Sequence, residues 1–187
     1  MQDPPETTAG LPRFAKIGIA IALLVLLYYG VTGGIRAYVD GQIQKSEGKP
    51  MPTLALTDLT GKPWSNADLL GKTTVLNFFR SKCPSCLKER DVIAQLAKEA
   101  DPAKLQVLGV MTDRVVSGIS EDLTRKTLAR MAYEHPILMA DQALVDAFHG
   151  AGWAHVTPVT YIVDAKGVIV QALRGHQTLK TLRSATQ

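Results

Sequence analysis

The two cysteines of this 187-residue chain stand three positions apart, in the stretch FFRSKCPSCLK at residues 78–88. A C-x-x-C pair can exchange thiols with disulfides, contribute to a metal site, hold covalent haem when a histidine follows, or form a structural disulfide. Which of these Cys83 and Cys86 do depends on the elements that position them.

The residues on either side of the pair predict a strand and then a helix. The apolar run Thr73–Phe79 is typical of a buried strand. From Pro84 onward, apolar residues recur at helical steps, namely Val92, Ile93, Leu96, Ala97 and Ala100. Cys83 is therefore expected at a helix N-terminus, where unpaired N–H groups and the helix dipole stabilise a thiolate. Cys86 is expected one turn further on, within reach of the Cys83 sulfur.

This geometry favours thiol–disulfide exchange, with Cys83 as the nucleophile and Cys86 as the resolving thiol. Lys82 and Arg80 add positive charge beside Cys83, so we expect them to lower its pKa further. The expected redox group is the Cys83–Cys86 disulfide itself, with no metal and no other cofactor.

The competing uses of the pair are less well supported. Covalent haem needs a histidine directly after the second cysteine, and that residue is Leu87. His149 and His155 follow Cys86 by more than sixty residues, too far for the usual spacing of a zinc site. A purely structural disulfide would close a very small loop, for which the entropic gain is smallest.

The N-terminal region contains a candidate membrane span at residues 17–35. Its sequence, IGIAIALLVLLYYGVTGGI, has no charged residue, and nineteen residues make about 28 Å of helix, close to the hydrocarbon thickness of a bilayer. Arg13 and Lys16 precede the span, which predicts a short cytoplasmic N-terminus at residues 1–16. A cleaved signal peptide is the alternative, and both interpretations export the remainder of the chain.

A polar segment at residues 36–47 is expected to be a linker to a domain at residues 48–187. That domain contains 17 Lys and Arg against 13 Asp and Glu, so it accounts for the whole net charge of +4. The basic residues are scattered and do not alternate with aromatic ones, so we expect no nucleic-acid partner.

The predicted domain alternates strands with helices and ends in a hairpin. Further strands are indicated by KLQVLGVMTD and PILMAD, and further helices by SEDLTRKTLARMAYEHP, which ends at Pro136, and by QALVDAFHGAG. Two β-branched runs joined by the turn DAKG then precede a terminal helix, HQTLKTLRSATQ. This order predicts an α/β fold with a mixed sheet flanked by helices.

At this level of detail, the chain resembles the membrane-anchored thioredoxin-like proteins of the TlpA and ResA type, within the AhpC/TSA-like superfamily. The resemblance rests on LTDLTGKPWSNADLLGKTTVLNFFRSKCPSCLKE and on VTPVTYIVDAKGVIV, and it covers residues 50 to 180. It implies a thioredoxin-like fold with an N-terminal β-hairpin extension. It also implies that Pro158 is cis and faces the cysteines, and that Thr157 and Pro158 bind the substrate chain.

The chain departs from the family pattern at several positions. Lys82 replaces the usual tryptophan before the first cysteine, and Asn77 stands where thioredoxin has a buried aspartate that could accept a proton. Glu89 lies among other charges and is expected on a solvated helix face. The remaining aromatic candidates are expected to serve mainly in packing or in loops: Trp64, Trp153, His149 and His155.

Together these features predict a single-pass protein of a bacterial inner membrane whose domain faces the periplasm and exchanges electrons with protein disulfides. The resemblance implies clients such as apocytochrome c or proteins of metal-centre assembly, with a membrane partner as the source of reductant. Two alternatives remain. One is a peroxide reductase of the peroxiredoxin type, although its P-x-x-x-T-x-x-C motif is absent. The other is a metal-binding chaperone, for instance for copper, although copper-delivery relatives of this fold use C-x-x-x-C.

Overall fold

The computed structural model describes residues 12–187, so residues 1–11 of the predicted cytoplasmic segment lie outside the described residues. The chain divides into two compact units, of which the first ends at Val39 and the second spans Asp40–Gln187.

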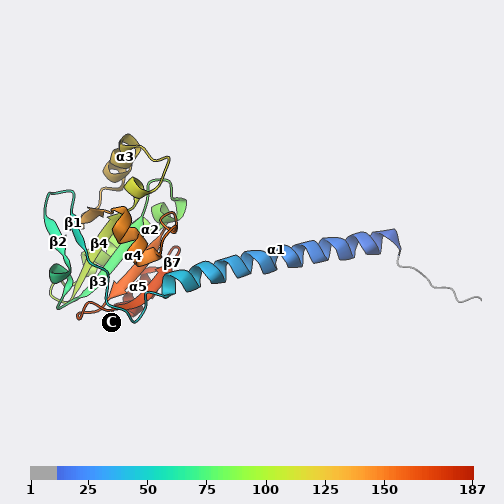
Figure 1. Cartoon of the computed structure of the whole chain (residues 1–187), viewed down its shortest axis with the longest axis horizontal. Coiled ribbons are helices and arrows are strands. Elements are labelled where there is room, and N and C mark those ends of the chain that lie inside the picture. Colours follow the sequence, from blue (N-terminus) through green and yellow to red (C-terminus); the bar gives the residue numbers. More distant parts are fainter. Residues whose placement is uncertain (1–11) are drawn as a thin grey trace, which may run out of the picture. The chain divides into compact units, whose positions relative to one another are not determined.

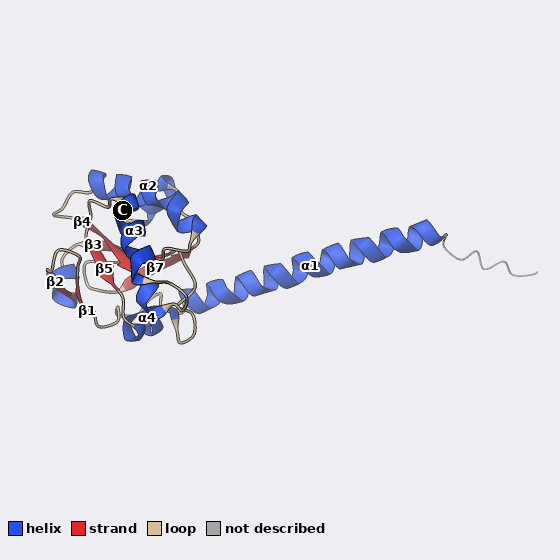
Figure 2. Cartoon of the chain, turned by 90° about the horizontal axis from the view of Figure 1, so that it is seen from above, coloured by secondary structure: helices blue, strands red, loops and turns tan. Residues whose placement is uncertain are grey.

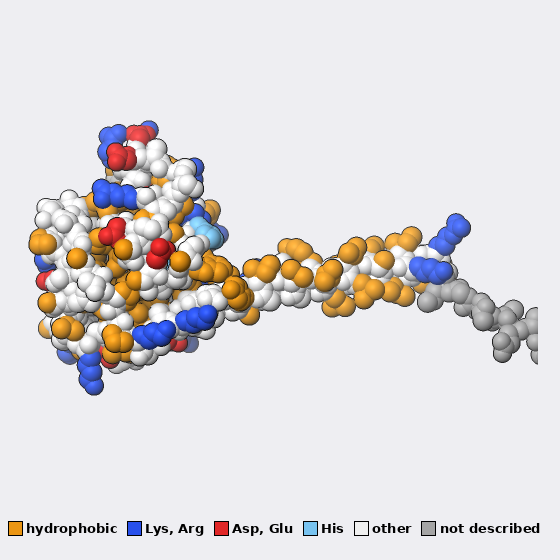
Figure 3. All heavy atoms as spheres, viewed as in Figure 1, with side chains coloured by type: hydrophobic (Ala, Val, Ile, Leu, Met, Phe, Trp, Pro, Cys, Tyr) orange, Lys and Arg blue, Asp and Glu red, His pale blue; other side chains and the backbone are white. Residues whose placement is uncertain are grey.

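The first unit consists of most of helix α1 (Arg13–Gln44), which contains the candidate span. Among the described residues, α1 is the one helix long and apolar enough to cross a membrane. Its apolar side chains, for example Leu24 and Leu26, are largely exposed (Figure 3). Lys and Arg side chains gather at its N-terminal end, as expected at one membrane boundary (Figure 3).

The segment 36–47 differs from the linker expected there, because α1 continues through it to Gln44. The second unit also begins at Asp40, eight residues before the predicted boundary at residue 48. Polar side chains are compatible with a helix, and residues 36–47 contain no proline, so polarity alone did not mark the end of α1. Ile43 is fully buried and belongs to the core of the second unit. The last turn of α1 is therefore part of the domain.

The domain is built on a mixed five-stranded sheet in the order β5-β4-β3-β6-β7. Figure 1 labels β3, β4 and β7 of this sheet. The strands are β3 (Thr73–Phe79), β4 (Leu105–Met111), β5 (Ile137–Met139), β6 (Val159–Val163) and β7 (Ile169–Arg174). β3 pairs in parallel with β4, and β4 with β5, whereas β6 is antiparallel to both β3 and β7. The predicted mixed sheet and the predicted strand Thr73–Phe79 are confirmed, and the structure places that strand at the centre of the sheet.

A separate two-stranded antiparallel hairpin, β1 (Ala55–Thr57) and β2 (Pro63–Ser65), precedes the sheet and confirms the expected N-terminal extension. A short 3-10 helix, η1 (Asn66–Leu69), connects the hairpin to β3. Asp58 stabilises the turn between β1 and β2, because its carboxylate accepts hydrogen bonds from Thr60 and from the indole N–H of Trp64.

Helices cover both faces of the sheet (Figure 2). They are α2 (Pro84–Glu99), η2 (Asp113–Val115), α3 (Glu121–Met131), α4 (Gln142–His149) and α5 (Leu179–Ala185). Helix α3 begins after Ser120, whose hydroxyl caps it, but it ends before the predicted Pro136. Ala132 has a left-handed φ of 46° and donates its N–H to the Leu128 carbonyl, which terminates the helix.

The alternation of side chains along β3 divides the core between the two faces. Val75 packs with Ile93 of α2 and Leu182 of α5, whereas Phe78 points the other way and packs with Phe148 of α4 and with Tyr161. A third cluster surrounds the cysteines. The redox pair thus lies just beyond the end of β3, and α2, which begins at that pair, packs against the sheet.

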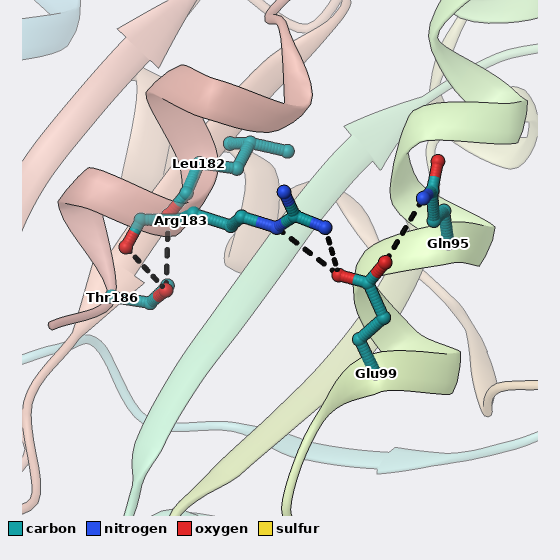
Figure 4. A network of polar contacts seen from close by, with 5 residues as sticks. All are labelled: Gln95, Glu99, Leu182, Arg183 and Thr186. Atoms are coloured by element: carbon teal, nitrogen blue, oxygen red, sulfur yellow. Dashed lines mark hydrogen bonds and ion pairs between the residues drawn. The ribbon is translucent and has the colours of Figure 1, made fainter.

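Polar contacts also join α2 to α5. Figure 4 shows Arg183 of α5 reaching Glu99 of α2, with its Nη2 2.6 Å from the Glu99 carboxylate, while Gln95 donates to the other carboxylate oxygen. These hydrogen bonds, that of Arg183 first, lower the pKa of Glu99. Because the ion pair is half exposed, we expect it to orient α5 more than to stabilise the fold.

Candidate active site

Cys83 and Cys86 form a disulfide at the start of α2, directly beyond the end of β3. Cys83 is the N-cap residue, and its sulfur accepts a hydrogen bond from the Cys86 N–H at 3.1 Å. Pro84 occupies the first turn. The predicted strand-to-helix junction is confirmed, and it places one backbone donor on the sulfur that would become a thiolate. Both cysteines are largely buried, with exposed fractions of 4% and 2%.

The loop before β6 lies against this disulfide. The Thr157 carbonyl oxygen is 3.5 Å from Cys83 Sγ, and the Thr157–Pro158 peptide bond is cis, as the family resemblance implies. Two residues separated from the cysteines by more than seventy positions are thereby brought to the redox centre.

The charged residues before Cys83 contact neighbouring loops. Arg80 Nε donates to the Thr157 hydroxyl at 3.1 Å, and Lys82 Nζ donates to the Gly118 carbonyl at 2.7 Å. Both side chains are held by neutral acceptors. Their effect on the Cys83 pKa stays a prediction.

Ser81, which lies between these two cations in the sequence, forms hydrogen bonds to a buried carboxylate. Asp113 of η2 accepts hydrogen bonds from the Ser81 N–H and hydroxyl, and also from the Thr124 hydroxyl of α3 at 2.6 Å. Asp113 is only 3% exposed. This contact fixes the residues that lead into Cys83 to the β4–α3 connection, and the sequence motifs did not reveal it.

Glu89 corrects the sequence-based prediction of a solvated residue, because it is buried with an exposed fraction of 1%. Its carboxylate accepts hydrogen bonds from the Asn77 side-chain amide at 2.9 Å and from the Gln177 N–H at 2.8 Å. Burial raises the pKa of Glu89, against the opposing effect of these two hydrogen bonds. A carboxyl group thus lies inside the protein one helical turn after Cys86.

The side chains of Asn77 and Glu89 belong to one hydrogen-bonded group. Asn77 on β3 donates to Glu89 and also to the Thr160 hydroxyl on β6 at 3.0 Å. A buried carboxylate on α2 is thus held by an amide on the neighbouring strand β3.

The helical spacing contained a signal for the burial of Glu89. The buried residues of α2 are Cys86, Glu89, Ile93 and Leu96, which recur at steps of three and four. Extending the apolar stripe backward from Ile93 places Glu89 on the same face as Cys86. Its charged neighbours in sequence, Lys88 and Arg90, lie on other sides of the helix.

The aromatic and histidine candidates lie mainly in the core and loops. Trp64 is buried in the hairpin, whereas Trp153 stacks on the exposed His155 in the loop before Pro158. His149 is 1% exposed and packs on Phe78, so it belongs to the core and not to a solvated loop. Within residues 12–187, no group of three or more His, Cys, Asp or Glu side chains is placed to hold a metal ion.

The buried histidines predict a loss of stability in acid. Burial lowers the pKa of both His149 and His135 from 6.5 to about 4. As the pH falls from 6.5 toward 4, the unfolded chain binds protons that the folded protein does not, so the free energy of unfolding decreases in that window, by on the order of 1–3 kcal/mol per histidine. Thermal unfolding of the full-length protein in detergent at pH 7 and pH 5 would measure the decrease. A His149→Gln variant with an undiminished pH dependence would contradict the assignment to His149.

Comparisons with known proteins agree with this geometry. The profile of the AhpC/TSA family matches residues 48–172. The thiol-disulfide oxidoreductase ResA of Bacillus subtilis is 25% identical over 166 residues, covering 88% of this chain and 86% of that protein. The thiol:disulfide interchange protein DsbE of Allochromatium vinosum is 30% identical over 168 residues, covering 87% and 83%.

A solved structure shows the likeness of fold. StoA from Bacillus subtilis matches with a TM-score of 0.62 at 18% identity, covering 73% of this chain and 97% of that chain. The expected thioredoxin-like fold is confirmed. The named relatives show that the chain is a thiol–disulfide oxidoreductase.

Proposed function

Since the chain belongs to the AhpC/TSA family and is a thiol–disulfide oxidoreductase, we propose that it acts from a membrane tether on exported client proteins. The disulfide at the N-terminus of α2, beside the Thr157 carbonyl, is the observation that carries the proposal. The substrates are proteins that carry thiols or disulfides. The membrane tether and the identity of the client proteins are what we propose.

The exchange begins with Cys83 in the reduced protein. Its thiolate, supported by the Cys86 N–H, attacks one sulfur of a client disulfide; that S–S bond breaks, and the other client sulfur leaves as a thiolate. Cys86 then loses its proton and attacks Cys83 Sγ. The Cys83–Cys86 disulfide forms, the second client sulfur is released, and the client has gained two electrons. The reverse sequence transfers a disulfide to the client.

The client chain binds beside Pro158 in this proposal. The Thr157 carbonyl lies 3.5 Å from Cys83 Sγ, so a polypeptide lying along the Thr157–Pro158 segment would bring its own sulfur to Cys83. Pro84 and Ser85 are exposed next to the buried cysteines and leave room for such a chain.

Residues 17–35 provide the tether. Helix α1 is long and apolar enough to span a bilayer, and the cations Arg13 and Lys16 precede its apolar part, which favours a cytoplasmic N-terminus and a periplasmic domain at a bacterial inner membrane. A membrane redox protein would then renew the thiols. The names of the relatives support disulfide chemistry, and we infer apocytochrome c thiols or proteins of metal-centre assembly as clients by that likeness.

Trapping in cells tests this function. In the full-length Cys86→Ser protein the resolving thiol is gone, so mixed disulfides between Cys83 and client proteins should accumulate in the membrane fraction and disappear on reduction. Mass spectrometry of the trapped clients would identify them, and exported proteins with C-x-x-C-H sequences would support the role in cytochrome c maturation.

The matched control is the Cys83→Ser, Cys86→Ser double variant, which should trap nothing. Trapping of cytoplasmic proteins alone would contradict the exported location. A full-length wild-type protein that consumes peroxide and does not reduce insulin disulfides would favour a peroxidase instead.

A further inference from the structure

Four segments of the chain surround the Cys83–Cys86 disulfide. They are residues 78–88, 114–120, 150–158 and 174–178. Lys82 Nζ bonds to the Gly118 carbonyl, which joins the second segment to the first, and the Thr157 carbonyl lies 3.5 Å from Cys83 Sγ, which joins the third. Gly175 of the fourth segment donates its N–H to the Pro158 carbonyl at 2.8 Å.

These four segments contain no aspartate and no glutamate, although 17 of the 187 residues are acidic. Their cationic residues are Arg80, Lys82, Lys88, Arg114 and Arg174. Of these, Arg174 pairs with Asp40. Lys82, Lys88 and Arg114 are exposed, and Arg80 is partly exposed. We call these four residues the cationic face.

The charges of the cationic face are not neutralised by carboxylates. Arg80 donates to the Thr157 hydroxyl and Lys82 donates to the Gly118 carbonyl, both of which are neutral acceptors. Within the described part of the chain, none of the four residues forms an ion pair. The hydrogen bonds hold the two cations nearest to Cys83 in place and leave their positive charge available to a partner.

Two acidic groups of the site point into the protein. Glu89 is 1% exposed and bonds to Asn77, and Asp113 is 3% exposed and bonds to Ser81. The exposed Asp91 pairs with Arg90, outside the four segments. Glu121 and Asp122 of α3 are exposed beside Arg114, but Asp122 pairs with Arg125 and Lys126. The charges that directly precede Cys83 in the chain, those of Arg80 and Lys82, are therefore positive.

We propose that the cationic face selects client polypeptides that carry aspartate or glutamate beside their reactive cysteine. This inference rests on the proposed function and names the substrate class of the same site. Complementary charge speeds the encounter of two chains, and a like-charged partner is repelled. Since the four charges are at the surface, the preference should weaken as salt shortens the range of electrostatic attraction.

Two synthetic peptides test the preference. Both carry one C-x-x-C disulfide, with glutamates flanking it in one peptide and lysines in the other. With the reduced full-length protein in detergent, the acidic peptide should be reduced about tenfold faster at low ionic strength. The ratio of the two rates should approach one in molar salt.

Charge reversal locates the effect. Lys82→Glu and Arg114→Glu should each lower the ratio of the two rates, and together they should bring it close to one, because two reversals offset the two remaining positive charges. The ratio is the readout because any change in the Cys83 pKa alters both rates alike. Lys166→Glu is the matched control, since Lys166 lies in the turn after β6, at the end of the sheet away from Cys83, and should leave the ratio unchanged.

Equal rates for the two wild-type peptides, or a ratio that survives both reversals, would overturn this inference and leave the proposed function standing. Exchange with neither peptide would overturn the proposed function, and the inference with it.

Discussion

Replacement of Cys83 by serine is expected to reduce insulin-disulfide reduction by the full-length protein to the rate seen with dithiothreitol alone. Cys83 is the N-cap of α2, and its sulfur is the one that accepts a backbone N–H and lies 3.5 Å from the Thr157 carbonyl. No other thiol occupies that position, so the first attack on the client disulfide is lost. Turbidity of precipitating insulin measures the rate.

The Cys86→Ser variant distinguishes the roles of the two cysteines. It should also fail to turn over, yet it should form one equivalent of mixed disulfide with a client peptide, visible by mass spectrometry before reduction. If Cys83→Ser formed that adduct and Cys86→Ser did not, the assignment of nucleophile and resolving thiol would be reversed.

Glu89→Gln is expected to slow resolution of the mixed disulfide by about a hundredfold or more, the range typical of loss of a general base. Cys86 must lose a proton before it attacks Cys83, and Glu89 is a buried carboxyl one helical turn away whose pKa is raised by burial. The raised pKa makes its carboxylate a better proton acceptor. Rapid-quench measurement of client release from the mixed disulfide, at several pH values, isolates this step.

A change in the pH profile separates proton transfer from a structural role. The wild type should lose rate as Glu89 becomes protonated in acid, and Glu89→Gln should show no such decrease. Glu99→Gln, an exposed carboxylate on the same helix, is the control and should retain the wild-type profile. An unchanged rate in Glu89→Gln, despite a normal fold, would exclude Glu89 as the proton acceptor.

The redox pair and its supporting elements were predictable because their signals are local. The apolar run Thr73–Phe79 coincides with β3, and Pro84 begins α2, so the position of Cys83 followed from two adjacent patterns. The cis Pro158 followed from the resemblance, since nothing in its local sequence determines a contact with a cysteine more than seventy residues away.

The polar interior of the site was harder to predict because its partners are distant in sequence. Glu89 receives hydrogen bonds from β3 and from the β7–α5 loop, and Asp113 receives them from Ser81 and Thr124. A charged residue is usually solvated, and only the packing of α2 on the sheet reverses that expectation. The prediction of a linker at residues 36–47 was wrong for a related reason. Ile43 is the buried residue of this polar segment, and its contact with the core could not be inferred from its neighbours in sequence.

The burial of Ile43 constrains how a soluble form of this protein can be made, by a protease or by design. A cut at the predicted boundary of residue 48 would remove Ile43 from the core and also remove Glu47, which accepts a hydrogen bond from the Ala172 N–H of β7. It would also separate Arg174 from Asp40. A released fragment that keeps the whole domain therefore begins at or before Asp40, within the same continuous helix that carries the span.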